Sequence, residues 1–393
     1  MLCLFLYKCR RKPNFIFMSV PHVKFDNKKD PEFYKELRKR VNSYFSGNNI
    51  SKYANLNMKL KSVFMLCLYF VPFILMITGT IDSNWGIIGM WAIMGFGVAG
   101  IGLSIMHDAN HGSYSTNQFV NKLMGGTLNF AGGYPLNWII QHNVLHHTFT
   151  NIEHFDEDIE KKGIMRFTPN QEHKAIFKFQ IFYAPILYAV LTLYWVLSKD
   201  FEQLYRYEKL GLLKAQDMSY RKALLQIIFM KVAYLIVFFI LPLFIVDAHW
   251  GIILSGFLIM HAIAGLVLAL IFQSAHVIKE TEFFEADEEN SVEENWAILQ
   301  MRTTANFANG STLFSWYIGG LNYQIEHHLF PTVCHVHYRH ISKIVKATAE
   351  EYGVPYHHHK TFLGALKSHF TLLNDLGTGK YDKKVALQES ENS

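Results

Sequence analysis

Residues 61–106 read KSVFMLCLYFVPFILMITGTIDSNWGIIGMWAIMGFGVAGIGLSIM. Two apolar runs, at about 61–80 and 86–106, are joined by IDSNW, which contains neither Lys nor Arg. Each run has the roughly 20 residues that an α-helix needs to cross the hydrocarbon core of a bilayer. Because the connection is so short, we expect a transmembrane helical hairpin that returns the chain to the side of the membrane from which it started.

A second pair of apolar runs repeats this pattern later in the chain. It covers about 225–246 and 250–272 and is joined by Asp-Ala-His, again without a basic residue at the turn. Residues 1–62, by contrast, hold fourteen Lys and Arg against four acidic residues. Basic flanks of membrane helices stay in the cytoplasm, so both hairpins are expected to begin and end there. Since a membrane explains this charge, we expect no nucleic-acid partner.

Two further apolar stretches are too interrupted to predict a full span. Residues 119–136 contain four glycines and a proline, and residues 176–197 are rich in tyrosine, which favours the headgroup level of a bilayer. We expect both to lie at the membrane interface.

The predicted fold is therefore an all-α integral membrane protein. It has four transmembrane helices in two hairpins, interfacial helices and a histidine-rich cap on the cytoplasmic side. Three regions are expected: a basic cytoplasmic N-terminal segment (1–57), a membrane domain (58–345) and a polar cytoplasmic tail (346–393).

Twenty histidines are present, and many of them follow the apolar runs directly. His107 and His111 come after the second run at a spacing that puts both imidazoles on one helix face. His142 and His146 are spaced in the same way, while His147 is expected to point about 100° away and to reach a neighbouring ion.

Two more histidine positions are predicted to lie on the same side of the membrane. His276 follows the last span, and Gln324-Ile-Glu-His327-His328 forms a third cluster. Neutral imidazole suits iron, zinc and copper, so the residue type does not name the metal. Four ligands satisfy one tetrahedral zinc, whereas eight imidazoles and an amide indicate two ions with positions left open for a small molecule.

The three clusters, HDANH, HNVLHH and QIEHHLFP, resemble the histidine boxes of the membrane fatty-acid desaturases. The resemblance runs from about Trp85 to the region after His340, and glutamine in place of the first histidine of the third box is similar to the front-end subgroup, which includes linoleoyl-CoA and sphingolipid desaturases. It implies metal ligation by His107, His111, His142, His146, His147, His276, Gln324, His327 and His328. It further implies two iron ions, O2 as co-substrate and a fatty acyl lipid as substrate.

Many members of that subgroup carry a fused cytochrome b5 domain, which is marked by His-Pro-Gly-Gly. This motif is not in the sequence, so electrons are expected from an external carrier of the cytochrome b5 or ferredoxin type. No catalytic side chain separate from the metal centre is expected. Several polar residues near the boxes are candidates to accept the second N–H of ligand imidazoles, namely Asp108, Asn110, Asp156, Asp158 and Glu326.

Other histidines are interpreted as non-ligands, three because they lack a matching set of partners and three because they lie on a polar tail. They are His335, His337, His340 and the run His357-His358-His359.

Three functions remain to be compared. The first is oxygen-dependent desaturation of a lipid acyl chain, because an unactivated methylene offers no acidic proton and needs a redox metal. The second is hydroxylation at the same centre. The third is metal transport, which would place ionisable ligands in the middle of the spans, where His261 is the exception among mostly apolar residues.

Overall fold

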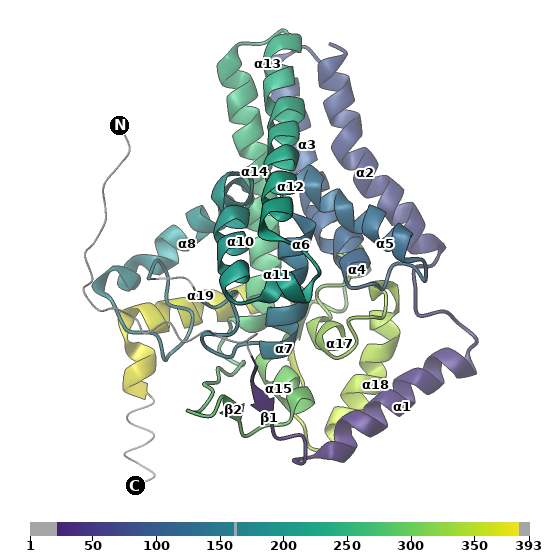
Figure 1. Ribbon diagram of the computed structural model, residues 1–393, viewed down its shortest axis with the longest axis vertical. Coiled ribbons are helices and arrows are strands. Elements are labelled where there is room, and N and C mark those ends of the chain that lie inside the picture. The colour runs from purple at the N-terminus through teal and green to yellow at the C-terminus, as the bar shows by residue number, and fades with distance from the viewer. Residues whose placement is uncertain (1–21, 161–162, 385–393) are drawn as a thin grey trace.

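The computed structural model describes residues 22–160 and 163–384, and these residues fold into a helical bundle with a helical cap (Figure 1). Long helices stand side by side toward one end of the molecule, and further helices with a short strand pair lie toward the other. The first half of the described chain forms β1 (Lys24–Phe25), α1 (Pro31–Gly47), α2 (Leu56–Ile77), α3 (Asn84–Gly100), a π-helical segment (Ile101–Met106), α4 (His107–Asn110), α5 (Gln118–Gly125), a 3-10 segment (Gly126–Ala131), α6 (Pro135–Trp138), a second π-helical segment (Ile139–His146), α7 (His147–Phe149), a 3-10 segment (Ala175–Phe179), α8 (Gln180–Ala189) and α9 (Leu191–Tyr194).

The second half continues from the bundle into the cap. It forms a π-helical segment (Trp195–Lys199), α10 (Asp200–Lys209), α11 (Leu212–Ala215), α12 (Tyr220–Leu235), a π-helical segment (Ile236–Ile240), α13 (Leu241–Ile245), α14 (Trp250–His276), β2 (Ser291–Val292), α15 (Trp296–Thr303), β3 (Ala305–Phe307), α16 (Thr312–Tyr317), α17 (Gln324–Leu329), a 3-10 segment (His335–His337), α18 (Tyr338–Glu351), β4 (His357–His359) and α19 (Phe362–Thr378).

Among residues 22–160 and 163–384, four helices are long and apolar enough to cross a membrane, which confirms the predicted spans. They cover Leu56–Ile77, Asn84–Asn110, Tyr220–Ile245 and Trp250–His276. Each begins or ends within a few residues of the predicted run. Asn55 and Ser83 cap the first two helices by accepting hydrogen bonds from the backbone N–H groups of the first turn.

The glycines of α3 let it pack tightly between its neighbours α2 and α14. A Cβ added at Gly97 would lie 2.8 Å from the backbone nitrogen of Tyr69 on α2, and one at Gly95 would lie 2.7 Å from the carbonyl oxygen of Met260 on α14. Small residues at such contacts allow helix backbones to approach closely, as is common in membrane bundles. Packing of α3 thereby joins the two hairpins.

The outer faces of the long helices are apolar. Only 28% of the most apolar window of Tyr220–Ile245 is buried inside the protein. Phe229 and Phe244 on this span are 70% and 84% exposed. An exposed apolar surface of this kind is covered by lipid in a membrane protein.

Both interrupted stretches form short helices with exposed apolar side chains, as expected for elements at the interface. Residues 119–136 become α5, a 3-10 segment and a turn at Gly132, and α5 exposes Phe119 and Leu123. The tyrosine-rich stretch lies in a pair of helical arms, Ala175–Ala189 and Leu191–Lys209, which bend by 58° at their junction. These arms reach the length of a fifth span only if they are counted together, and α8 slants away from the bundle (Figure 1).

The cap combines segments that are far apart in the sequence. Two parallel strand pairs, β1 with β2 and β3 with β4, tie the N-terminal and C-terminal parts to the middle of the chain. Helix α1 packs against α18, and α19 buries Leu372, Leu373 and Leu376 beside Phe167. The described part of the expected tail is thus part of the cap. Residues 1–21 of the basic N-terminal segment lie outside the described residues.

Candidate metal centre

The first two histidines lie where the second span enters the cap. A π-helical segment, Ile101–Met106, precedes His107, and α4 carries the chain on to His111. Their imidazole centroids are 4.8 Å apart. The spacing of four residues therefore brings both rings to one side of the helix, as the sequence predicts.

The second cluster is shaped by another π-helical segment, Ile139–His146. A π-helix closes its turn between residues five apart, so His147 returns over His142 instead of diverging from it. The Nε2 atoms of these two histidines are 3.2 Å apart. The divergence expected for an α-helix is therefore wrong, although His147 still reaches the neighbouring group, because its ring centroid is 4.4 Å from that of His328.

The third cluster comes from α17 and faces the other two. His327 on α17 places its Nε2 atom 2.9 Å from that of His147. The neighbouring His328 has its ring centroid 4.7 Å from that of His276, the last residue of α14. Segments separated by more than two hundred residues thus meet at the end of the bundle.

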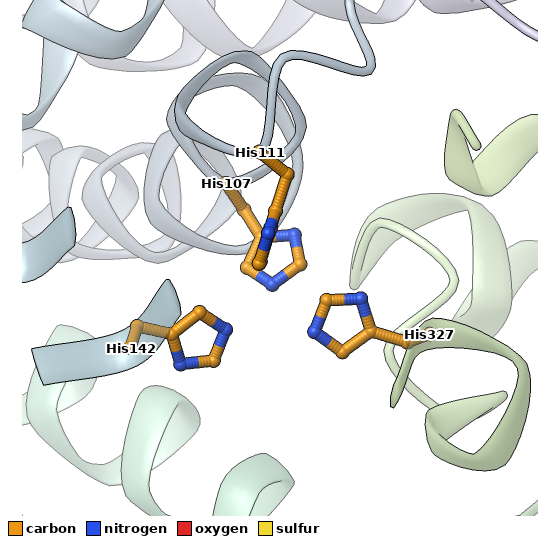
Figure 2. Close-up of side chains that lie close together, drawn as sticks. All are labelled: His107, His111, His142 and His327. Atoms are coloured by element: carbon orange, nitrogen blue, oxygen red, sulfur yellow. The ribbon is translucent and has the colours of Figure 1, made fainter. Parts of the chain in front are cut away.

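All eight predicted histidines come together in two adjoining groups. Within each group, one ring nitrogen per residue lies within 4.8 Å of the others. The first group surrounds a common space, into which rings from three segments point (Figure 2), and consists of His107, His111, His142 and His327. The second group consists of His146, His276 and His328. His147 joins them, because it also forms a set with His327 and His328.

The surroundings of four of these imidazoles favour the neutral form. Burial, reinforced by the neighbouring imidazoles, keeps the pKa of His142, His147, His327 and His328 well below the usual value. A neutral imidazole keeps one nitrogen lone pair, which is the form that binds a metal ion.

Several inner nitrogens lack a hydrogen-bond partner among the described residues. The Nε2 atoms of His107, His111, His276 and His328 are buried, and none has a hydrogen-bond partner among residues 22–160 and 163–384. Each such buried atom costs about 1–3 kcal/mol if it stays unsatisfied. A pair of metal cations would satisfy all of these atoms at once, so the residues fit a metal centre.

Carboxylates hold the outer nitrogens of two of the histidines. Nδ1 of His146 lies 3.0 Å from a carboxylate oxygen of Asp156 and 3.5 Å from one of Asp158, and Nδ1 of His107 lies 3.5 Å from Asp108. An N–H that donates outward fixes the ring orientation and leaves the inner nitrogen available as a ligand. Three of the five candidate partners therefore lie where the sequence analysis expected them.

Comparison with known proteins agrees with this architecture. The family model described as fatty acid desaturase matches residues 83–360, which include all three histidine clusters. The chain belongs to the fatty acid desaturase family. An sn-1 linoleoyl-lipid 6-desaturase of Synechocystis is 32% identical over 92% of this chain and 99% of its own length. The enzyme of the same name in Arthrospira platensis is 34% identical over 90% of this chain and 95% of its length.

A third relative, an acyl-lipid (8-3)-desaturase of Physcomitrium patens, is 35% identical over 91% of this chain and 74% of its own length. These similarities confirm the predicted front-end group and the predicted enzyme class: the protein is an oxidoreductase that desaturates acyl chains. The names of the relatives favour desaturation over the two alternatives, a hydroxylase and a metal transporter. His261, the exception in the spans, makes hydrogen bonds with Thr192 and Tyr234 and is a satisfied core residue.

Three partners of the desaturase histidines were not found by sequence reasoning. Nδ1 of His328 lies 2.8 Å from the side-chain oxygen of Gln300, and Nδ1 of His276 lies 3.2 Å from the carbonyl oxygen of Thr303. Nδ1 of His327 lies 3.2 Å from the hydroxyl of Tyr338. Only folding brings these ordinary residue types to the boxes, so no local pattern marks them.

Two expected partners lie elsewhere. Asn110 contacts Met106 and Asn143. Glu326 accepts hydrogen bonds from Asn306 and Tyr356, and its burial raises its pKa to about 7. Because its carboxylate pairs with Asn306 and Tyr356, Glu326 ties α17 to β3, and no contact with a ligand imidazole is seen among the described residues.

Gln324 is fully buried at the start of α17. Neither polar atom of its amide meets a partner at hydrogen-bonding geometry among the described residues, although the amide lies near His276.

The histidines interpreted as non-ligands fall into two kinds. His337, His340 and the strand His357–His359 lie outside both groups: His337 contacts the carbonyl oxygen of Tyr53, and His340 stacks on Tyr44. His335 differs from them because it is buried next to Asp108, with Nδ1 2.8 Å from the carboxylate.

Proposed function

We propose that this desaturase binds two iron ions between its two histidine groups and uses them with O2 to insert a double bond into the acyl chain of a membrane lipid. The observation that carries the proposal is the pair of adjoining groups, in which buried nitrogens such as Nε2 of His107 and His328 have no hydrogen-bond partner among the described residues. Two groups that share His147 as a neighbour favour two ions close together over one isolated ion.

The chemistry requires a redox metal. Iron and O2 would supply the oxidising power that takes one hydrogen from each of two neighbouring methylenes. Overall, one O2, two electrons and two protons are consumed together with the two hydrogens, and two water molecules leave. No side chain in the site provides such an oxidant by acid–base chemistry alone.

The protein supplies geometry and exclusion of water. The proposed ligands are the eight histidines, which meet in the two groups, and Gln324, whose buried amide lies near His276. Asp108, Asp156, Gln300 and Tyr338 would hold the imidazoles in fixed orientations. The spans would accommodate the acyl chain and bring one carbon pair to the centre.

The relatives indicate the substrate class. Two of them are named as linoleoyl-lipid desaturases and a third as an acyl-lipid desaturase. We propose that this chain also acts on a polyunsaturated acyl chain esterified to a membrane lipid, with the new double bond between the carboxyl end and the existing double bonds.

Feeding linoleic acid to cells that express the chain tests this proposal. We expect a fatty acid with one additional double bond on the carboxyl side, which mass spectrometry of suitable derivatives locates. Cells that express the His328→Ala variant serve as the control. A new double bond on the methyl side, or a hydroxylated product in its place, would contradict the proposed regiochemistry or reaction.

The proposal also covers the source of the electrons and the side of the membrane that the metal centre faces. We expect a separate carrier of the cytochrome b5 or ferredoxin type to deliver the electrons. The surplus of basic residues in 1–62 favours a cytoplasmic metal centre. The turns of the hairpins, which contain Asp82 and Asp247, would then face the opposite side.

Cysteine labelling tests this orientation. In a variant in which the native cysteines are replaced, single cysteines at the exposed positions Asp82 and Asp247 should react with an impermeant thiol reagent added outside intact cells. Single cysteines at Glu289 and Lys346, which are exposed in the cap, should react only after permeabilisation. External labelling of the cap positions would contradict a cytoplasmic centre.

Substitutions at Gln324 distinguish its contribution to activity and iron binding from that of the histidines. An amide oxygen is a weaker donor than an imidazole, so Gln324→Ala should lower activity by about 10- to 100-fold while most iron is retained. Gln324→His should keep the iron and part of the activity, because imidazole is a competent donor. Double-bond formation and bound iron are measured together in both variants. Full activity of Gln324→Ala would show that the amide is neither a ligand nor a necessary support.

A further inference from the structure

A buried chain of polar groups connects α2 to the first histidine box. Lys61 lies in the second turn of α2 with 1% of its surface exposed, and its Nζ atom is 2.6 Å from Nε2 of His335. On the other side of the ring, both Nδ1 and the backbone nitrogen of His335 contact one carboxylate oxygen of Asp108, at 2.8 and 3.0 Å. The other oxygen of Asp108 lies 3.5 Å from Nδ1 of His107.

Hydrogen-bond chemistry gives this chain a direction. An ammonium group only donates, so Nε2 of His335 accepts from Lys61 and the ring proton stays on Nδ1. That N–H donates to Asp108, as does the backbone N–H of His335. The carboxylate can only accept, so its second oxygen favours the tautomer of His107 that carries its proton on Nδ1. The buried Nε2 atom of His107 is then the one that keeps the lone pair.

Charge balance supports the same reading. A buried lysine in a membrane helix is costly unless an opposite charge compensates it, and Asp108 supplies that charge through the His335 ring. Cys334 lies beside the same carboxylate, and together Asp108, Cys334 and His335 have a spacing that suits a metal ion. Lys61 already brings a positive charge to this group, so we interpret it as a hydrogen-bonded chain and not as a third metal site.

We propose that Lys61 and His335 are positioning residues that act through Asp108 to fix the orientation and tautomer of His107. The proposal rests on the proposed function, in which His107 holds iron. It assigns a role to a lysine in a membrane span and to a histidine outside the three boxes. The contacts join α2, the first box and the 3-10 segment before α18, so they also hold the first histidine group at the end of the bundle.

Iron retention tests the proposal independently of activity. The purified, iron-loaded enzyme is mixed with an excess of a ferrous chelator, and the rate of iron release is followed by absorbance. Removal of an outer partner of a metal ligand typically costs about 10- to 100-fold in metal affinity. We therefore expect Lys61→Met and His335→Leu to release one of two irons at least about 10-fold faster than the wild type.

Two matched variants separate positioning from general damage. Lys231→Met removes another buried lysine from a membrane span, where its Nζ atom is 2.6 Å from Asp200, and it should release iron at the wild-type rate. His335→Asn keeps an amide N–H near the position of Nδ1, so it should restore much of the retention that His335→Leu loses. Thermal unfolding of each variant shows whether the changes in stability are comparable.

A double variant tests whether Lys61 acts through Asp108. If it does, adding Lys61→Met to Asp108→Asn should not accelerate iron release further, because the link to His107 is already broken. Multiplicative effects would contradict this path, as would wild-type retention in Lys61→Met and His335→Leu. A wild-type protein that holds no iron would instead overturn the proposed function and not only this inference.

Discussion

Replacement of His328 with alanine is expected to reduce double-bond formation by at least about 1000-fold, because residues that act as one unit in a centre lose function together. His328 belongs to the second histidine group and also faces His147, the residue that joins the two groups. Its loss removes one strong donor and leaves Gln300 without the N–H that it accepts. Bound iron should fall from two to about one per chain.

A matched control makes this result specific. His358→Ala removes an exposed histidine on β4, outside both groups, and should retain full activity and iron. The measurements are the double-bond content of lipids from expressing cells and the iron content of the purified variants. An active His328→Ala variant with normal iron would show that the second group does not hold a metal.

Removal of the metal is the second change with a large expected effect. Treatment of the reduced enzyme with a chelator should abolish desaturation, and ferrous iron should restore it, whereas zinc should not, because zinc has no redox chemistry. The metal-free protein should also unfold at a lower temperature. Ligand binding at 100 times the dissociation constant stabilises the folded state by about 2.7 kcal/mol.

The buried imidazoles explain why the metal-free protein should unfold at a lower temperature. Without a cation, several inner nitrogens are buried without a partner among the described residues, and the Nε2 atoms of His147 and His327 face each other at 2.9 Å. Unfolding is measured by fluorescence or calorimetry with and without ferrous iron, and His328→Ala serves as the control with a smaller stabilisation. Equal activity and equal stability before and after chelation would contradict a role for the metal.

Local sequence signals were enough to predict the bundle. Runs of apolar residues of membrane length depend only on composition, so all four spans were placed within a few residues of their ends. The short turns without basic residues predicted the two hairpins. The packing of α19 against the membrane-proximal core was not predicted, since the burial of Leu372 and Leu376 depends on contacts with Phe167 and not on their own segment.

For the metal centre too, the features with a local sequence signal were predicted, and those that depend on the tertiary fold were not. The eight histidines were found because apolar helices end next to them and because their spacing repeats. The direction of His147 was missed, since a π-helical turn differs from an α-helical one and has no clear signal in the sequence. Gln300 and Tyr338, which contact box histidines, and Lys61, which contacts His335, were missed because only the tertiary fold brings them to these partners.

Metal analysis of the purified, active wild-type chain tests the central claim most directly. Iron and zinc are measured by mass spectrometry against protein concentration, and desaturation is assayed in the same preparation. The two adjoining histidine groups predict two iron atoms per chain and activity that rises in proportion to iron. An active preparation that contains one zinc and no iron would contradict a di-iron centre.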